Sequence, residues 1–471
     1  MAGGLVVFGV AGYAFVSVTG WTLDKSEANL AIAFYFLTNV IGPGIFYAIE
    51  QVTSRSTSRA LAAGLALGPA LRRVRRAGAG LVAVIMALLV LLAPVMIGAT
   101  LHGDWVLFAC VLATPVITAA MSLIRGEMAG RQRFDRYAGT LAIEGFVRLV
   151  LCLLLALAGT DVAWIFGVGF LGASVVAVGI GRLWLQGGDQ ADEAFVTDNG
   201  EPVVTNGGEA VATKDGEAVV TENGVVTENG VATGDGAVGA EDGERYPPVG
   251  RGLAALALAT LFAQLLPNIA PLVVTSRLAQ DSAVALAFGQ AAVMARMPLL
   301  LFSPVQTMLL PGLTAAVTRG ELRTVARRVA LTMAVIAVLG TLAVVVFVLL
   351  GPWVLRTFLN TTTDLGAAIL LLLATSTVVL IAAYAVQPAL VALGRDRVVT
   401  AGWALGTAVT MALALLPGDA VSFGAGGQFT GPVLTLVVVV LGLRAGLRAP
   451  AKEVPGRLVA VNASSSATPD P

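Results

Sequence analysis

Charged side chains inside long apolar stretches are the residues of this chain that could do chemistry. Glu144 and Arg148 stand four residues apart in one such stretch, glutamate first, which is the favoured order for an ion pair along a helix. A charge at mid-bilayer is costly, so it usually faces a partner or a water-filled cavity. The pair either neutralises itself and stabilises its helix, or lines a polar cavity; the sequence leaves both open.

Arg296 lies in another apolar stretch and has no acidic residue within four positions. A guanidinium at that depth needs a partner on another helix or an anionic ligand. We expect it either to face a substrate cavity or to pair with a structural partner such as Glu144 or Glu50. Glu50 ends an apolar stretch near the expected cytoplasmic interface, where we expect it to cap the helix or to form a gate contact with Arg55.

The sequence offers no catalytic or metal-binding constellation. Its single histidine, His102, adjoins an expected turn, and Cys110 and Cys152 fall in apolar stretches, where cysteine packs as a small hydrophobe. No Gly-x-x-x-x-Gly-Lys-Ser/Thr phosphate loop is present. We therefore expect neither an enzyme nor a bound metal or cofactor.

Twelve apolar stretches must position these charges. Of the 471 residues, 57% are hydrophobic and 12% are charged, against about 25% charged in soluble domains. About 20 apolar residues span a bilayer as a helix, the form that satisfies its own backbone there. We place spans at 2–21, 30–51, 78–101, 105–124, 138–159, 163–185, 252–275, 285–310, 328–350, 366–391, 399–416 and 429–446.

The expected fold class is an all-α integral membrane protein with twelve transmembrane helices in two six-helix bundles related by a pseudo-two-fold axis. The first lobe covers 1–186 and the second 250–448, joined by a linker at 187–249 and followed by a tail at 449–471. The linker holds 14 acidic and 2 basic residues and repeats Val-Val-Thr-Glu-Asn-Gly at 219–224 and 225–230. Such a composition cannot bury enough apolar surface to fold, so we expect disorder in the linker and tail.

Arginine and lysine predict the orientation. With the N-terminus in the cytoplasm, arginines cluster after the second, fourth, eighth and tenth spans and at the C-terminal end, whereas the outer loops hold only Lys25, Arg277 and Arg356. This asymmetry predicts a multi-pass protein of the plasma membrane with both termini and the linker inside the cell. The basic segment Arg55–Arg76 is either an amphipathic helix on the inner leaflet or an ordinary loop.

Proline and glycine interrupt several spans. The second span contains Gly42, Pro43 and Gly44; the eighth contains Pro298 and Pro304 and ends at Pro311; the tenth contains Pro388. Proline removes a helix hydrogen bond and bends the axis. The second and eighth spans are each the second of their six, so the two lobes should break at matching helices, which in transporters indicates a binding site or hinge.

Two of these stretches resemble a known family. Met294–Pro298, Pro304 and Leu309–Leu313 resemble the eighth helix of lipid-linked oligosaccharide flippases. Gly42–Gly44 with Glu50–Arg55 resembles the second helix of polysaccharide flippase homologues. This flippase family belongs to the multidrug/oligosaccharidyl-lipid/polysaccharide exporter superfamily, which also contains the multidrug and toxin extrusion (MATE) transporters.

The resemblance implies two bundles around a central cavity that carry a polyprenyl-pyrophosphate-linked glycan from the inner to the outer leaflet by alternating access. Arg296 would bind the pyrophosphate, with Arg148 and Glu144 as further cavity candidates. Lipid II flippases of this group carry arginines on their first two helices, and here those helices have none within the membrane, so an exopolysaccharide or capsule precursor fits better than lipid II. The implied partners are the lipid-linked glycan, membrane lipids and the glycosyltransferases or polymerase of a polysaccharide pathway, with no nucleic acid.

Two other functions remain open. A MATE-like exporter of cationic drugs would need acidic or aromatic residues deep in the cavity; Glu144 qualifies, whereas Arg296 argues against it. A non-transporting scaffold would tether cytoplasmic partners through the acidic linker. The scaffold should tolerate straightening of the second and eighth spans, whereas a flippase should lose function when Gly42 or Pro304 is changed.

Overall fold

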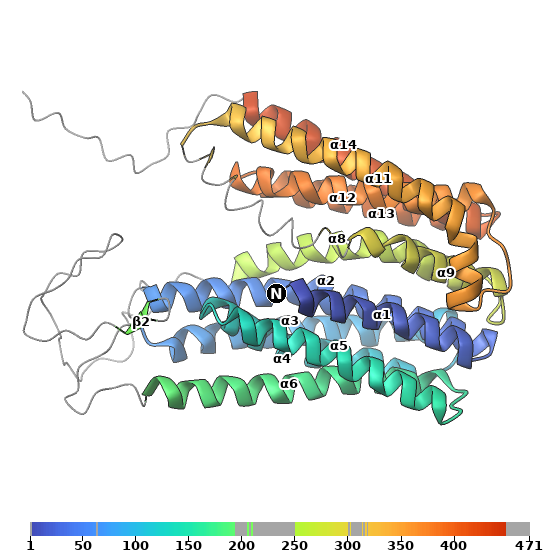
Figure 1. Ribbon diagram of the computed structural model, residues 1–471, viewed down its shortest axis with the longest axis horizontal. Coiled ribbons are helices and arrows are strands. Elements are labelled where there is room, and N and C mark those ends of the chain that lie inside the picture. Colours follow the sequence, from blue (N-terminus) through green and yellow to red (C-terminus); the bar gives the residue numbers. More distant parts are fainter. Residues whose placement is uncertain are drawn as a thin grey trace, which may run out of the picture.

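The computed structural model is built of long helices in two groups (Figure 1). It describes residues 2–62, 65–193, 250–299 and 319–448, together with 205–206, 209–210, 302, 313, 316 and 317. Eleven of the described helices are long and apolar enough to cross a membrane, and a shorter apolar helix covers Ala283–Leu299. The chain is an all-helical, multi-pass membrane protein, as the sequence predicts.

The first lobe contains six helical spans, and the third of them passes into a π-helical turn, η1, at its C-terminal end. Their bounds are α1 (Ala2–Thr22), α2 (Lys25–Ala62), α3 (Leu67–Val95), η1 (Met96–Thr100), α4 (Trp105–Gly130), α5 (Phe134–Leu157) and α6 (Ala163–Glu193).

The second lobe begins with α8, which lies between the two groups in Figure 1. Its helices are α8 (Gly250–Arg277), α9 (Ala283–Ala295), α11 (Leu322–Leu359), α12 (Ala367–Ala392), α13 (Asp396–Ala414) and α14 (Ala420–Arg448). Helix α8 packs on α2 and also on α13 and α14, so it joins the lobes along the middle of the molecule.

Several helices are longer than the apolar pattern predicts. Helix α2 continues through Arg55 and Arg59 to Ala62, and Arg72–Arg76 lie in the first turns of α3. The basic segment is therefore neither a separate amphipathic helix nor a plain loop, because both flanking helices extend into it. Likewise α4 runs to Gly130, so Arg125 is helical instead of lying in a loop.

Most of the acidic linker, and the tail 449–471, lie outside the described residues. At the start of the linker, α6 continues to Glu193, so 187–193 are helical where disorder was expected. Further along, the two-residue strands β1 (Thr205–Asn206) and β2 (Glu209–Ala210) pair antiparallel, with Thr205 opposite Ala210.

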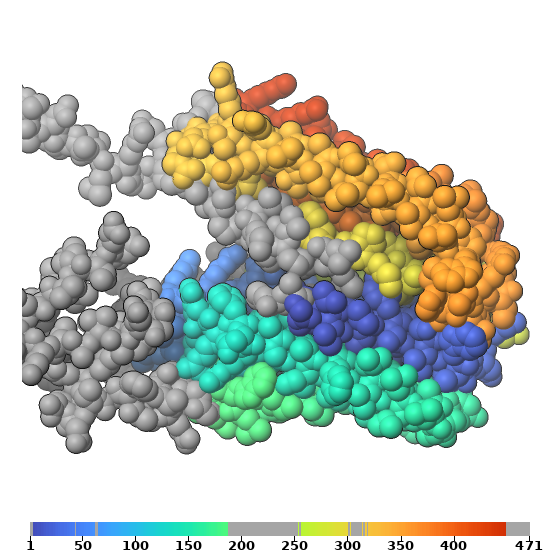
Figure 2. Space-filling model, viewed as in Figure 1, coloured from blue at the N-terminus to red at the C-terminus, as the bar shows by residue number. Residues whose placement is uncertain are grey.

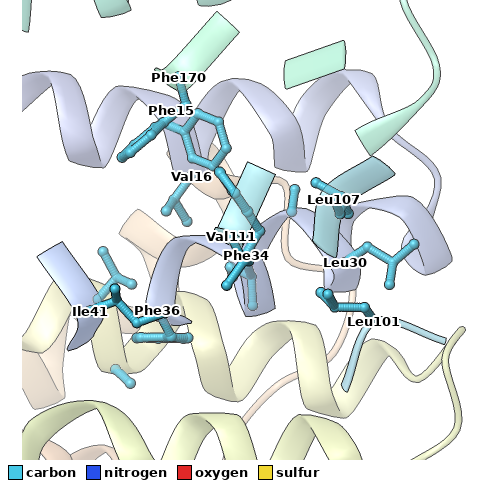
Figure 3. Close-up of a cluster of buried hydrophobic side chains, with 14 of the residues drawn as sticks. Phe15, Val16, Leu30, Phe34, Phe36, Ile41, Leu101, Leu107, Val111 and Phe170 are labelled. Atoms are coloured by element: carbon cyan, nitrogen blue, oxygen red, sulfur yellow. The ribbon is translucent and has the colours of Figure 1, made fainter. Parts of the chain in front are cut away.

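Exposed apolar side chains cover the outer faces of the lobes. On α11, Val338 and Leu349 are about 70% exposed (70% and 71%), which in water would be a severe cost but in lipid is the expected state. Inside the first lobe, aromatic rings from α1, α2 and α6 pack edge to face, with the centroids of Phe15 and Phe170 5.0 Å apart and those of Phe34 and Phe170 5.8 Å apart (Figure 3). This buried cluster fixes the faces of α1 and α2 that meet the second lobe.

The lobes also meet through hydrogen bonds at one end, which the arginine distribution predicts to face outside. The last carbonyls of α11 have no partner within that helix, and the carbonyl of Phe358 accepts from Ser17 and, at 3.1 Å, from Nε1 of Trp21. Asn29 on α2 donates to the carbonyls of Gln280 (2.8 Å) and Ser282 (3.1 Å). Figure 2 shows the end of α11, in orange, directly against the blue helices there. These hydrogen bonds join the two lobes at this end.

Candidate functional site

Arg296 lies where α9 ends. The N–H of Arg296 bonds to the carbonyl of Val293 (3.1 Å), a tightened last turn, and the chain resumes a helical conformation at Met297. Pro298 explains the break, because it has no N–H to give to the carbonyl of Met294 and its ring would clash with that carbonyl. The predicted interruption of the eighth span therefore occurs beside Pro298, and it puts Arg296 at the boundary between the lobes.

The guanidinium of Arg296 is held by neutral partners. It donates to Oδ1 of Asn268 (2.8 Å) and to the carbonyl oxygen of Pro267, both on α8. Its Cζ lies 5.2 Å from the centre of the Phe36 ring on α2, a cation–π contact across the lobe boundary. In the described part of the chain no carboxylate lies within ion-pair distance of Arg296, so its charge is available to an anion.

Three tyrosines interact electrostatically with this cation. Tyr13 (α1), Tyr35 (α2) and Tyr384 (α12) lie within electrostatic range of Arg296, and all three are partly exposed. The ring of Tyr35 packs on both Phe15 and Phe36. In Figure 3, Phe36 lies on α2 next to the yellow-green ribbon of the second lobe. The site thus presents one positive charge among phenol groups contributed by both lobes.

Glu144 and Arg148 bond to each other and not to Arg296, although Arg148 also lies within electrostatic range of Tyr35. They form the ion pair that their spacing predicts, with Nη2 of Arg148 2.9 Å from Oε1 of Glu144. Arg125 on α4 binds the other carboxylate oxygen at 2.7 Å, and Ser174 on α6 donates to Oε1 at 2.6 Å. The guanidinium of Arg148 stacks 3.7 Å from the centre of the Phe170 ring. The side chains of the Glu144–Arg148 pair are at most 7% exposed, so this polar cluster lies inside the first lobe.

Glu50 and Arg55 do not contact each other in the manner expected. Oε1 of Glu50 accepts from the hydroxyl of Tyr137 on α5 at 2.8 Å, and Arg55 is exposed and bonds Gln51 on its own helix (3.4 Å). The carboxylate turns into the first lobe because α2 continues past it, so Glu50 does not cap a helix end.

Of the expected breaks, only the one beside Pro298 interrupts a helix among the described residues. Helix α2 runs continuously through 42–44, and Pro388 lies within continuous α12. Pro304 and Pro311 lie outside the described residues. The lobes therefore do not break at matching helices within the part the structure describes: α9 ends at Ala295, whereas α2 does not end until Ala62.

Gly44 faces α8 of the second lobe, whereas Gly42 faces Thr114 and Thr118 on α4 of its own lobe. A Cβ atom at position 44 would lie 2.9 Å from Cβ of Gln264 on α8, whereas one at position 42 would meet nothing closer than 3.4 Å. Because glycine has no side chain, the backbones of α2 and α8 can approach each other at position 44. Close backbone approach is how helices pack in lipid, where no hydrophobic driving force brings them together.

The arrangement of helices matches solved transporter structures. An inward-facing multidrug resistance MATE transporter of the MOP superfamily superposes with a TM-score of 0.63 at 12% identity, over 94% of this chain and 93% of that one. The lipid II flippase MurJ, in an inward closed conformation, gives 0.61 at 11% identity, over 94% and 86%. The MATE transporter VcmN of Vibrio cholerae gives 0.52 at 15%, over 95% and 97%.

The chain has the fold of the MATE transporters and of MurJ. No protein-family model matches the sequence, and no curated protein does. The MATE and MurJ likenesses are of nearly equal extent and show the fold alone, so an argument about function has to come from the residues of this chain.

Several residues around Glu144 and around Arg296 were not predicted from the sequence. Arg125 lies one position beyond the expected end of its span, and so was counted with a loop. The seventh span contains Asn268 and two prolines four residues apart, Pro267 and Pro271. Each proline frees the carbonyl four positions earlier, so this spacing could have indicated hydrogen-bond acceptors there.

Proposed function

We propose that this protein is a membrane transporter that moves an anionic, polyprenyl-linked oligosaccharide from the inner to the outer leaflet by alternating access. The observation that carries the proposal is Arg296, a cation at the lobe boundary whose described partners are all neutral. Guanidinium groups bind phosphate in a bidentate geometry with high strength. The pyrophosphate of a lipid-linked sugar is an anion of this kind.

The physical task supports this cargo. A charged, hydroxyl-rich headgroup cannot cross hydrocarbon without a large desolvation cost. Between the lobes it would meet a positive charge and the hydroxyls of Tyr13, Tyr35 and Tyr384, while its polyprenyl tail stays in lipid. The hydrogen bonds at the outer end close one side of this path in the state described.

Movement between states would use the break at Arg296–Pro298, with Pro43, Pro304, Pro311 and Pro388 as the further proposed bending positions. In the same proposal the protein lies in the plasma membrane, with both termini and the acidic linker in the cytoplasm. Glycosyltransferases or a polymerase of a polysaccharide pathway would supply or consume its cargo. We assign the cluster of Arg125, Glu144 and Arg148 to the stability of the first lobe, since its one carboxylate binds both arginines there.

A cationic-drug exporter is less well supported, because Arg296 would repel its cargo and Glu144 is already occupied by two arginines. A scaffold needs no unpaired cation between its lobes. The proposed function therefore predicts a transport activity that depends on the charge at position 296.

The test is flipping in proteoliposomes of a short-chain polyprenyl pyrophosphate that carries a fluorescent label, followed by quenching with dithionite. Arg296→Ala should abolish protein-dependent flipping, and Arg296→Lys should retain part of it, because lysine keeps the charge without the bidentate geometry. Arg356→Ala is the matched control: Arg356 is exposed on α11 and pairs with exposed Asp364. Full flipping by Arg296→Ala, or export of a cationic dye instead, would refute the proposal.

A further inference from the structure

Helix α8 carries two prolines four residues apart, Pro267 and Pro271. Because proline has no N–H, the carbonyls of Ala263 and Pro267 lose their partners within the helix. Side chains from other helices donate hydrogen bonds to both carbonyls. The hydroxyl of Tyr384 on α12 donates to the carbonyl of Ala263 at 2.9 Å, and the carbonyl of Pro267 accepts from Nε2 of Gln428 on α14 at 3.2 Å and also from Arg296. The proline pair thus turns two helix carbonyls into acceptors between helices.

Arg296 rests on one of these acceptors. Its guanidinium is fixed by the Pro267 carbonyl on one side and by Oδ1 of Asn268 (2.8 Å) on the other. Asn268 is itself held in place, since its Nδ2 donates to the carbonyl of Gln264 at 2.7 Å and the residue is only 3% exposed. The two acceptors are neutral, so they orient the guanidinium without neutralising it.

Gln428 has a further effect on the Pro267 carbonyl. Because it donates to the same carbonyl, the Pro267 oxygen keeps a hydrogen bond when Arg296 moves away. A buried carbonyl left without any donor would cost about 1–3 kcal/mol, and Gln428 removes that cost from the departure of Arg296.

We propose that the Pro267 carbonyl and Asn268 Oδ1 form a resting seat for the Arg296 guanidinium, from which an anionic substrate displaces it. Asn268 is then a positioning residue that sets the affinity of the site. This rests on the proposed function. The exchange is favourable because an anion attracts the guanidinium as an opposite charge, which a neutral carbonyl or amide oxygen does not do. A carboxylate at position 268 would hold the arginine and compete with the substrate.

The test measures the Kd of inorganic pyrophosphate and of farnesyl pyrophosphate for the purified full-length protein in detergent, by isothermal titration calorimetry. Asn268→Ala should tighten binding several-fold, because one half of the seat is gone. Asn268→Asp, which has the same shape, should weaken binding about tenfold, the factor that separates a charged from a neutral hydrogen bond. A residue that served only to pack α9 against α8 would not shift Kd in opposite directions.

A matched pair of proline variants provides the second measurement. Pro271→Ala restores an N–H that competes for the Pro267 carbonyl, so it should tighten binding as Asn268→Ala does. Pro352→Ala is the control: it restores an N–H inside α11, which takes no part in the described contacts of Arg296, and it should leave Kd unchanged.

The two proposals fail differently. If the wild type binds pyrophosphate and Arg296→Ala does not, yet the Asn268 and Pro271 variants bind like the wild type, the seat is wrong and the anion site stands. Equal binding, or none, by the wild type and Arg296→Ala would refute the anion site, and the seat with it.

Discussion

Gly20 on α1 lies directly against the carbonyl oxygen of Leu359 at the end of α11. A Cβ atom at position 20 would lie 2.7 Å from that oxygen and 2.6 Å from Nε2 of Gln290. Gln290 is fully buried and donates to the same carbonyl at 2.8 Å. At the end of the molecule where α1 and α11 finish, the lobes are therefore joined by a backbone-to-backbone approach that only glycine permits.

Gly20→Ala should loosen this contact and lower the thermal stability of the purified protein, because overpacking of this kind costs about 1–3 kcal/mol. The measurement is the unfolding temperature in detergent, followed by tryptophan fluorescence. Gly366→Ala serves as the control, since a Cβ there meets nothing within 4 Å. An unfolding temperature for Gly20→Ala equal to that of the control would contradict the close approach.

Gly44→Ala should impair transport, whereas Gly42→Ala should be tolerated. The added methyl at 44 would press on Gln264 and push α8 from α2, while at 42 it finds ordinary van der Waals space. Flipping rates in proteoliposomes of the two variants, at matched protein levels, decide this. Equal loss in both would instead favour a need for backbone flexibility at 42–44.

Glu144→Gln should destabilise the first lobe strongly. It leaves Arg125 and Arg148 buried without their carboxylate, and breaking one partner of a buried ion pair costs about 3–5 kcal/mol. Asp364→Asn, at the exposed pair with Arg356, should cost about 0–1 kcal/mol. Both are read from thermal unfolding in detergent. A Glu144→Gln protein as stable as the wild type would mean that the cluster is not structural.

Asp24→Ala should weaken the start of α2 by about 1 kcal/mol, the usual value of an N-cap. Oδ1 of Asp24 accepts from the N–H of Glu27 and the hydroxyl of Ser26, both at 2.9 Å, and these bonds hold the pKa of Asp24 below its ordinary value. A lowered pKa in the folded state means that the contribution is complete above the unfolded value, near 3.9, and is lost as the pH falls through the folded value. The unfolding temperature should therefore change less between pH 7 and pH 3 in Asp24→Asn than in the wild type, because asparagine caps the helix at both pH values. The same change in both proteins would contradict the role of Asp24 as a cap.

The apolar pattern predicted the position of nearly every helix, but not its ends. Spans were set by hydrophobicity, and helices such as α2 and α4 continue past the apolar residues because arginines and threonines at the interface still propagate backbone hydrogen bonds. For that reason Arg125 was assigned to a loop, and its ion pair with Glu144 was not predicted. The pair of Glu144 and Arg148 was predictable because four residues along one helix bring the two side chains together whatever the rest of the chain does.

The sequence by itself determined that this chain enters a membrane as helices, and its arginines predict which way, because both depend on the transfer free energy of each local segment. It also supplied Arg296 as a cation without an acid nearby. Only the tertiary structure decided what Arg296 touches: Asn268 is 28 positions away and Phe36 is on the other lobe. Those contacts depend on how the two lobes pack, and packing between distant segments leaves no period in the sequence.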